Sequence, residues 1–203
     1  MSENKVIIAS RNKGKIAEIT AVLSKYGMDV ISRDDAGLDT FEVEETGETF
    51  EENSYIKAKA IMDLTGVATI SDDSGLMVDA LGGGPGVYSA RYAGEGCTYH
   101  DNNVKLLGAL KDVHGADRSA KFVTVATMLF PDGSKLVARG ECPGMIIEEL
   151  RGEGGFGYDP LFVPDGYDKT FAEMTPEEKN SLSHRAKAFT ELEKLLEEKI
   201  NNK

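Results

Sequence analysis

Apolar and polar positions in the first part of the chain alternate between strand-like runs and helix-like spacing. Short β-branched runs predict strands at 5–9, 29–32 and 67–70, and the first and last of these should be buried. Apolar residues at helical spacing predict one helix that ends at Gly27 and another over 50–64. Thr49 and Glu52 form a capping box that fixes the start of the second helix. In that helix we expect three residues to face the core: Ile56, Ala60 and Leu64.

The second half of the chain predicts strands that return antiparallel. Residues 120–130 alternate as a strand and 131–134 is a turn signal, so 135–141 should pair back, with 145–149 as a further strand. Capping residues predict two helices, one after Thr98 and one after Thr175, and the tail is an amphipathic helix over 186–200. We therefore expect an α/β fold whose sheet is mixed rather than purely parallel.

Composition narrows the class of protein. The 203 residues, 40% of them hydrophobic, are enough for one packed domain spanning 1–203. A formal net charge of -12 would repel a nucleic-acid backbone, so we expect no nucleic-acid partner, although lysines and a metal can still bind a free polyphosphate locally. Cys97 and Cys142 lack metal-like spacing, and the N-terminal apolar run is too short for a signal peptide or membrane span. We expect no disulfide, no membrane partner and a cytoplasmic location.

Two adjacent carboxylates, Asp72 and Asp73, follow the strand predicted over 67–70, and Ser74 comes next. Open α/β sheets usually bind ligands at the carboxyl ends of their strands. Adjacent carboxylates repel each other unless they are solvated or bind a cation, and oxygen ligands without thiolate or imidazole favour Mg²⁺ or Mn²⁺. On its own the motif more often marks an ordinary Asp-Ser-Gly turn, so its companions decide.

Three other segments suit a nucleotide. The segment SRNKGK at 10–15 opens a helix, where free backbone N–H groups and the helix dipole favour a phosphate, although it is not a Walker A loop. Lys57 lies near the start of the 50–64 helix, within reach of a phosphate. Phe156 lies among glycines, where an exposed ring can stack on a base. Taken alone, these three features are more simply explained as a solvated turn, a surface lysine and a hydrophobic mini-core, respectively.

Taken together, five segments in order resemble the Ham1 family of inosine/xanthosine triphosphate pyrophosphatases. They are SRNKGKIAE at 10–18, EETGETFEENSYIKAKA at 44–60, SDDSGLMVDALGGGPGVYSARYAG at 71–94, GGFGYDPLF at 154–162 and TFAEMTPEEKNSLSHRAKA at 170–188. The resemblance implies an elongated curved mixed β-sheet flanked by helices, with two lobes around a central cleft, and commonly a homodimer. Ser10 stands where threonine is common in the family, and Arg11 where glycine is frequent.

The resemblance also implies an activity, Mg²⁺-dependent hydrolysis of non-standard purine nucleoside triphosphates (ITP, dITP, XTP) to the monophosphate and pyrophosphate. This reaction cleanses the nucleotide pool. Two alternatives stay open. One is a related pyrophosphatase for pyrimidine or modified nucleotides, against which the His184–Arg185 pair speaks. The other is a non-hydrolysing nucleotide sensor, which would have little need of Asp73 and Glu44 together.

Roles for single residues follow from the resemblance alone. Asp73 is implied as the catalytic base and, with Glu44, as a ligand of Mg²⁺, with Mn²⁺ as the alternative metal. The residues implied to hold the triphosphate are Ser10, Arg11, Asn12, Lys13, Gly14, Lys15, Lys57, Ser74 and Lys179. Those implied to hold the base are Phe156, Gly157, Tyr158, Asp159, His184 and Arg185. Whether Asp73 deprotonates water or mainly positions the metal stays open.

Overall fold

The computed structural model describes residues 4–202, which divide into two compact units. The first unit takes residues 4–73, 125–139 and 188–202, and the second takes 74–124 and 140–187. Each unit is therefore assembled from stretches that are far apart in the sequence. The assignment of 1–203 to one domain stays a prediction.

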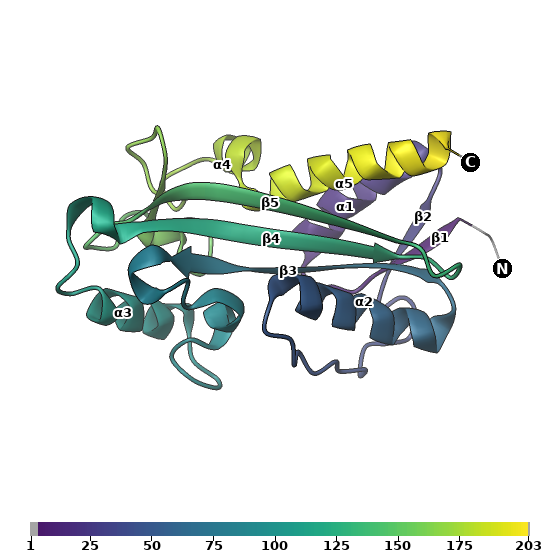
Figure 1. Ribbon diagram of the computed structural model, residues 1–203, viewed down its shortest axis with the longest axis horizontal. Coiled ribbons are helices and arrows are strands. Elements are labelled where there is room, and N and C mark those ends of the chain that lie inside the picture. The colour runs from purple at the N-terminus through teal and green to yellow at the C-terminus, as the bar shows by residue number, and fades with distance from the viewer. Residues whose placement is uncertain (1–3, 203) are drawn as a thin grey trace. The chain divides into compact units, whose positions relative to one another are not determined.

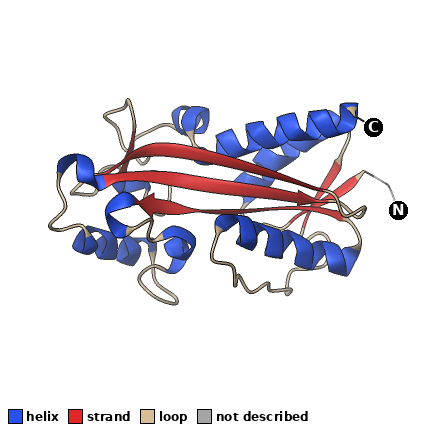
Figure 2. Ribbon diagram, viewed as in Figure 1, coloured by secondary structure: helices blue, strands red, loops and turns tan. Residues whose placement is uncertain are grey.

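Six strands form one sheet in the order β2-β1-β3-β4-β5-β6. Their bounds are β1 Lys5–Ile8, β2 Asp29–Ser32, β3 Ala68–Val78, β4 Ser119–Leu129, β5 Lys135–Ile146 and β6 Phe162–Pro164. β1 runs parallel to both β2 and β3, whereas β5 and β6 are antiparallel. The prediction of a mixed sheet flanked by helices is confirmed (Figures 1 and 2).

Five α-helices accompany the strands in the described residues: α1 Lys13–Leu23, α2 Phe50–Thr65, α3 Tyr99–Ala109, α4 Pro176–Leu182 and α5 His184–Asn201. The capping boxes predicted at Thr49 and Thr175 are both present, and Thr98 forms a third with Asp101. Each satisfies N–H groups that a helix start would otherwise leave unpaired. Within residues 4–202, no helix has the length and apolarity that a membrane span requires.

In the first unit, strand side chains alternate between two layers of helix. One face contributes to a buried cluster with α1 and α5, made of Val6, Ile8, Ile19, Leu23, Ile70, Ala126, Met128, Ala138, Phe189, Leu192 and Leu196. On the other face, Ser71 and Thr127 hydrogen-bond to Ser54 of α2. Figure 1 shows α1 and α5 on one side of these strands and α2 on the other. Successive residues of a strand point to opposite faces, so the register fixes which helix each side chain meets.

The buried stripe of α2 differs from the prediction. It consists of Phe50, Asn53, Ser54, Ala58 and Ile61. The expectation that Leu64 faces the core with Ile56 and Ala60 is wrong, because Leu64 is 58% exposed. The stripe includes a serine and an asparagine whose polar atoms are buried, and a count of apolar positions passes over such residues.

The second unit is built around an aromatic cluster. Phe162 packs edge-on against Phe122 at 4.7 Å between ring centroids and contacts Phe171 at 5.0 Å. The separate strand predicted over 145–149 is wrong, because β5 continues to Ile146. At this end of β5 the buried Arg118 guanidinium binds two carbonyls, with Nε donating to Ile146 O at 2.6 Å and Nη2 to Ile147 O at 2.9 Å.

Candidate functional site

β3 carries Asp72 and Asp73 in mid-strand. The prediction that the strand ends at Ile70, with both acids beyond it, is wrong, since β3 continues unbroken to Val78 (Figure 2). Asp72 therefore faces α1, where its Oδ2 lies 2.5 Å from Lys15 Nζ, and Asp73 faces α2, where its Oδ1 lies 3.4 Å from Lys57 Nζ. The two carboxylates lie on opposite faces of one strand, and each has its own lysine. Their adjacency in sequence is therefore no reason for a metal.

Asp73 lies in a buried cluster with two charged neighbours. Lys57 Nζ bridges to Glu45 Oε1 at 3.2 Å, and Asp73 itself is 8% exposed. Burial raises the pKa of Asp73, the charge of Lys57 opposes this and that of Glu45 reinforces it, with a net rise. Burial acts to lower the pKa of Lys57, but the carboxylates of Asp73 and Glu45 outweigh it and raise that pKa. A raised pKa makes the ionised carboxylate a stronger proton acceptor, which is what a general base at neutral pH requires.

One oxygen of Asp73 is left open. Asp73 Oδ2 is buried, yet it accepts no hydrogen bond from any residue within 4–202. Within the same residues, no three His, Cys, Asp or Glu side chains are grouped so as to hold a metal by themselves. Mg²⁺ commonly takes only one or two protein carboxylates and completes its shell with water and substrate phosphates. The open carboxylate oxygen therefore fits a Mg²⁺ ion that arrives with a nucleotide.

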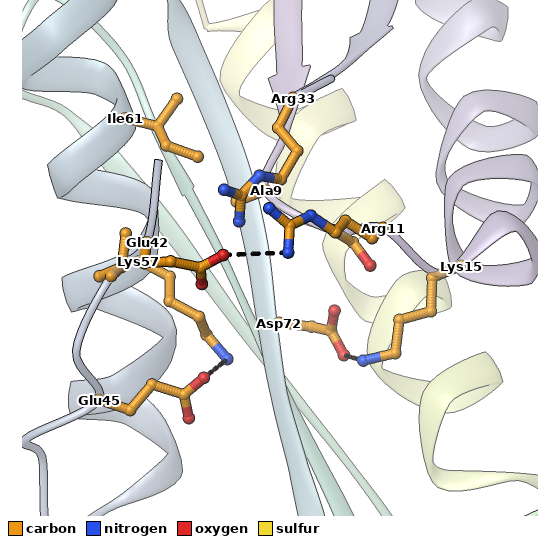
Figure 3. A pocket seen from close by; sticks show the side chains of 11 residues that line it. Ala9, Arg11, Lys15, Arg33, Glu42, Glu45, Lys57, Ile61 and Asp72 are labelled. Atoms are coloured by element: carbon orange, nitrogen blue, oxygen red, sulfur yellow. Dashed lines mark hydrogen bonds and ion pairs between the residues drawn. The ribbon is translucent and has the colours of Figure 1, made fainter. Parts of the chain in front are cut away.

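A pocket of about 250 Å³ in the first unit is rich in paired charges. Its charged lining residues are Arg11, Lys15, Arg33, Glu42, Glu45, Lys57 and Asp72. Figure 3 shows three of the pairs, in which Arg11 contacts Glu42, Lys15 contacts Asp72 and Lys57 contacts Glu45. The cations come from different elements, so only the folded chain gathers them. A triphosphate could bind these cations by replacing their carboxylate partners.

The turn before α1 is arranged differently from the prediction. The backbone N–H groups of Gly14 and Lys15 are not free, because both donate to Asn12 Oδ1, at 2.9 and 3.2 Å. Asn12 N in turn donates to Ser10 Oγ at 3.2 Å. Lys13 and Gly14 are exposed at the start of the helix. A phosphate would have to compete with Asn12 for this helix end, which leaves the side-chain cations as the stronger anion ligands.

The acidic loop, residues 34–48, borders the same pocket, and sequence reasoning missed the arginine that holds it. Arg33 is buried and donates to Leu38 O, at 2.9 Å from Nη2, and to Phe41 O. Arg11 also contacts the loop, through Glu42 at 3.1 Å. An arginine after a short strand gives no sequence signal for such a role.

Glu44 and Glu45 occupy different environments on that loop. Glu44, the implied metal ligand, is exposed and makes no ion pair with a described residue, whereas Glu45 pairs with Lys57. The structure thus adds Glu45 to the surroundings of Asp73. The two glutamates are adjacent in the sequence, and the resemblance singled out Glu44 alone.

In the second unit, the segment Phe156–Asp159 forms a tight turn around a buried acid. Asp159 Oδ2 accepts from Phe156 N at 2.8 Å and from Lys179 Nζ at 2.5 Å. Gly155 has φ +73° and a Cβ at this position would overlap Asp159 Oδ2, so only glycine fits there. Gly157 O accepts from Asn103 Nδ2 at 2.9 Å. The turn is therefore preformed by its own hydrogen bonds.

Phe156 is 46% exposed, and its ring lies beside two cations. Lys179 Nζ is 4.8 Å from the ring centroid and Arg185 Cζ is 5.8 Å from it. His184 is buried, with its ring stacked on Phe122 at 4.9 Å. Phe156, Lys179 and Arg185 thus form one group. It suits a planar ring whose face stacks on Phe156 and whose edge carries hydrogen-bond acceptors for the two cations.

Tyr158 and Ser74 are held by the second unit itself. The Tyr158 hydroxyl donates to Ser89 O at 2.8 Å, the side chain is 3% exposed and burial raises its pKa. Its side chain belongs to the core, so any contact of Tyr158 with a base would have to come from its backbone. Ser74 Oγ lies 2.8 Å from Thr124 Oγ1, and either hydroxyl can be the donor.

Comparison with known proteins identifies the family. The model of the Ham1 family matches residues 6–195. A "dITP/XTP pyrophosphatase" of Bacillus licheniformis is 50% identical over 193 residues, covering 95% of this chain and 98% of the relative, and one of Shigella flexneri is 47% identical over 200 residues, covering 98% of each. The solved structure of the Staphylococcus aureus Ham1 protein matches with a TM-score of 0.90 at 42% identity, covering 96% of this chain and 99% of that one. A match of this extent in sequence and in fold shows that the chain belongs to the Ham1 family.

Proposed function

We propose that this chain hydrolyses non-standard purine nucleoside triphosphates, such as dITP, ITP and XTP, to the monophosphate and pyrophosphate. Relatives that are nearly half identical over almost the full length carry the name dITP/XTP pyrophosphatase. The observation that carries the proposal is the buried carboxylate of Asp73. Its Oδ2 has no hydrogen-bond partner among residues 4–202, and its Oδ1 contacts Lys57. A protein that only bound nucleotides would gain nothing from burying such a group, because an unpaired buried oxygen costs stability.

The triphosphate would be held by cations of the first unit, Arg11, Lys15 and Lys57. Each is paired with a carboxylate at rest, at 3.1, 2.5 and 3.2 Å for Glu42, Asp72 and Glu45. Phosphate oxygens would replace those carboxylates, so each cation would have an anionic partner both before and after the nucleotide binds. Ser10, Asn12, Lys13 and Gly14 would add contacts at the start of α1, and Ser74 and Lys179 are further candidates.

Asp73 would act as the base that accepts the proton of the attacking water. Its raised pKa and its contact with Lys57 suit that role, because Lys57 keeps the ionised form available while burial keeps it basic. Asp73 and Glu44 would hold Mg²⁺, with Glu45 as the neighbouring carboxylate. When bound, Mg²⁺ would neutralise phosphate charge and lower the pKa of water.

The base would be selected by donors of the second unit. Arg185 Nε is buried and has no hydrogen-bond partner among residues 4–202, so it is a donor in need of an acceptor. A 6-oxo purine offers that acceptor, whereas adenine presents an amino group. With Phe156 and the Asp159 turn beside it, this donor would disfavour ATP by about 10- to 100-fold, since an unpaired buried donor costs about 1–3 kcal/mol. A homodimer is part of the proposal and rests on the family resemblance, and the cytoplasmic location expected from the sequence is part of it as well.

The test is a nucleotide panel with product analysis. Purified protein with Mg²⁺ is given dITP, XTP, ITP, ATP, GTP and a pyrimidine triphosphate, and pyrophosphate and orthophosphate are measured separately. Pyrophosphate release from dITP, ITP and XTP, well above that from ATP, is expected. As a matched control, Asp63→Asn removes an exposed acid of α2 that pairs with Lys59 at 2.5 Å, and it should leave the rates unchanged. Orthophosphate as the main product, or a preference for the pyrimidine, would refute the proposal.

A further inference from the structure

Asn53 and Asn102 occupy the same position in two helices. Each is the fourth residue after a capping threonine, Thr49 in α2 and Thr98 in α3. Each is buried, at 0% and 1% exposure, and each uses Oδ1 to accept a backbone N–H from the loop before its helix. These bonds, from Gly47 N at 2.8 Å and from Ala93 N at 2.7 Å, tie the loop to the helix in both cases.

The two asparagines differ in the other half of the amide. Asn102 Nδ2 donates to Ala90 O at 3.2 Å, so that side chain is satisfied as a structural tether. Asn53 Nδ2 is buried and makes no hydrogen bond with any residue in 4–202. A buried donor without a partner costs stability, so it calls for an explanation that the tether does not supply.

The Asn53 amide and the Asp73 carboxylate are neighbours, and each has one buried polar atom without a hydrogen-bond partner among residues 4–202. The amide is close enough to lower the pKa of Asp73, although the pair falls short of hydrogen-bond geometry. Lys57, one helical turn after Asn53, already contacts Asp73 Oδ1 at 3.4 Å, which leaves Oδ2 for the amide. The orientation of the amide follows from its other bond, since Oδ1 must face the N–H of Gly47 and Nδ2 therefore points the other way.

The same asparagine also fixes the acidic loop. A Cβ on Gly47 would lie 2.6 Å from Glu52 Cβ and 2.7 Å from Asn53 Oδ1, so the loop backbone packs directly on this side chain. Glu45 and Glu44 lie two and three residues before Gly47 in the loop. A single amide therefore connects the loop of the proposed metal ligand with the proposed base.

We propose that Asn53 is a positioning residue for Asp73: Oδ1 holds the loop of Glu44 and Glu45, and once a nucleotide is bound Nδ2 donates to one lone pair of Asp73 Oδ2, which leaves the other lone pair for Mg²⁺. Catalytic hydrogen bonds are often long or misaligned in free enzymes and tighten in the substrate complex. The role rests on the proposed pyrophosphatase function, and it adds a residue that the family resemblance did not assign.

The test compares Asn53→Asp with Asn102→Asp. Aspartate has nearly the same shape and keeps the acceptor for the loop N–H, but it replaces the NH₂ group with an oxygen. At position 53 that oxygen faces Asp73, whereas at position 102 it faces only Ala90 O. Four quantities are measured with the full chain: kcat and KM for dITP with Mg²⁺, the Kd of an α,β-methylene analogue of ITP, and Tm.

For Asn53→Asp we expect kcat to fall by about 10- to 100-fold, the range for losing a residue that orients a catalytic group. KM and the Kd of the analogue should stay within about threefold, and the Tm change should match that of Asn102→Asp, which keeps its kcat. A kcat for Asn53→Asp within about threefold of wild type overturns the proposal. So does a joint loss of Tm and analogue binding, because Asn53 would then be only a tether.

If Asn53→Asp does not fold, the alanine pair Asn53→Ala and Asn102→Ala replaces it under the same criteria. Both alanine variants lose the loop tether, and only the first loses the donor near Asp73. A wild-type protein that releases no pyrophosphate from any nucleotide refutes the proposed function and this role with it. An active wild type with a fully active Asn53 variant refutes this role alone.

Discussion

Replacing Asp73 with asparagine should abolish turnover and leave the fold intact. Asparagine has the same shape, and Lys57 keeps Glu45 at 3.2 Å, so no charge is left unpaired in the buried cluster. We therefore expect the free energy of unfolding to change by no more than about 1 kcal/mol, or about 2–4 °C in Tm. Loss of a general base should lower kcat by about 10²- to 10⁴-fold. Circular-dichroism melts and pyrophosphate release measure the two effects separately.

The pH dependence of the Tm difference tests the reasoning further. Because folding raises the pKa of Asp73, the ionised carboxylate destabilises the folded state at pH values above its folded pKa. That cost is lost as the pH falls to the ordinary carboxyl range, where folded and unfolded chains both bind the proton. The neutral amide of Asp73→Asn carries no such cost, so the Tm of the variant minus that of wild type, without metal, should be more positive at about pH 7.5 than at about pH 4. A variant that keeps most of its kcat, or one that is inactive because it has unfolded, would contradict the role of Asp73 as base.

Three other changes have defined outcomes. A chelator should remove activity and excess Mg²⁺ should restore it, because one or two carboxylates give a weak site; a tightly held zinc in the purified protein would contradict this. Arg185→Ala should lower kcat/KM for ITP far more than for ATP, and an equal loss for both would exclude Arg185 from base selection. Thr49→Ala removes the side chain that accepts from Glu52 N at 3.1 Å and should cost about 1 kcal/mol, and an unchanged Tm would show that the box adds nothing to α2.

The sequence by itself determined the elements whose signals are local. The box of Thr49 and Glu52 placed the start of α2 correctly, because capping depends on residues three apart. The β-branched run 29–32 predicted β2 with the bounds that the structure shows, and the turn at 131–134 predicted the return of β5. The ordered motifs predicted the family, and the comparisons confirm it. These predictions agree with the structure because residues close together in the sequence determine caps, strands and turns.

Only the tertiary structure decided how charges and buried polar groups are partnered. The sequence shows Asp72 and Asp73 as neighbours, but the continuation of β3 through them sends one to α1 and the other to α2. Their lysines lie 57 and 16 residues away along the chain, so no local pattern reveals the pairs. In the sequence Asn53 is one polar residue among many. Its proposed role depends on the Gly47 N–H on one side and on Asp73 on the other. Charge and hydrogen-bond energies depend on distances in space, and those distances exist only after the strands and helices have packed.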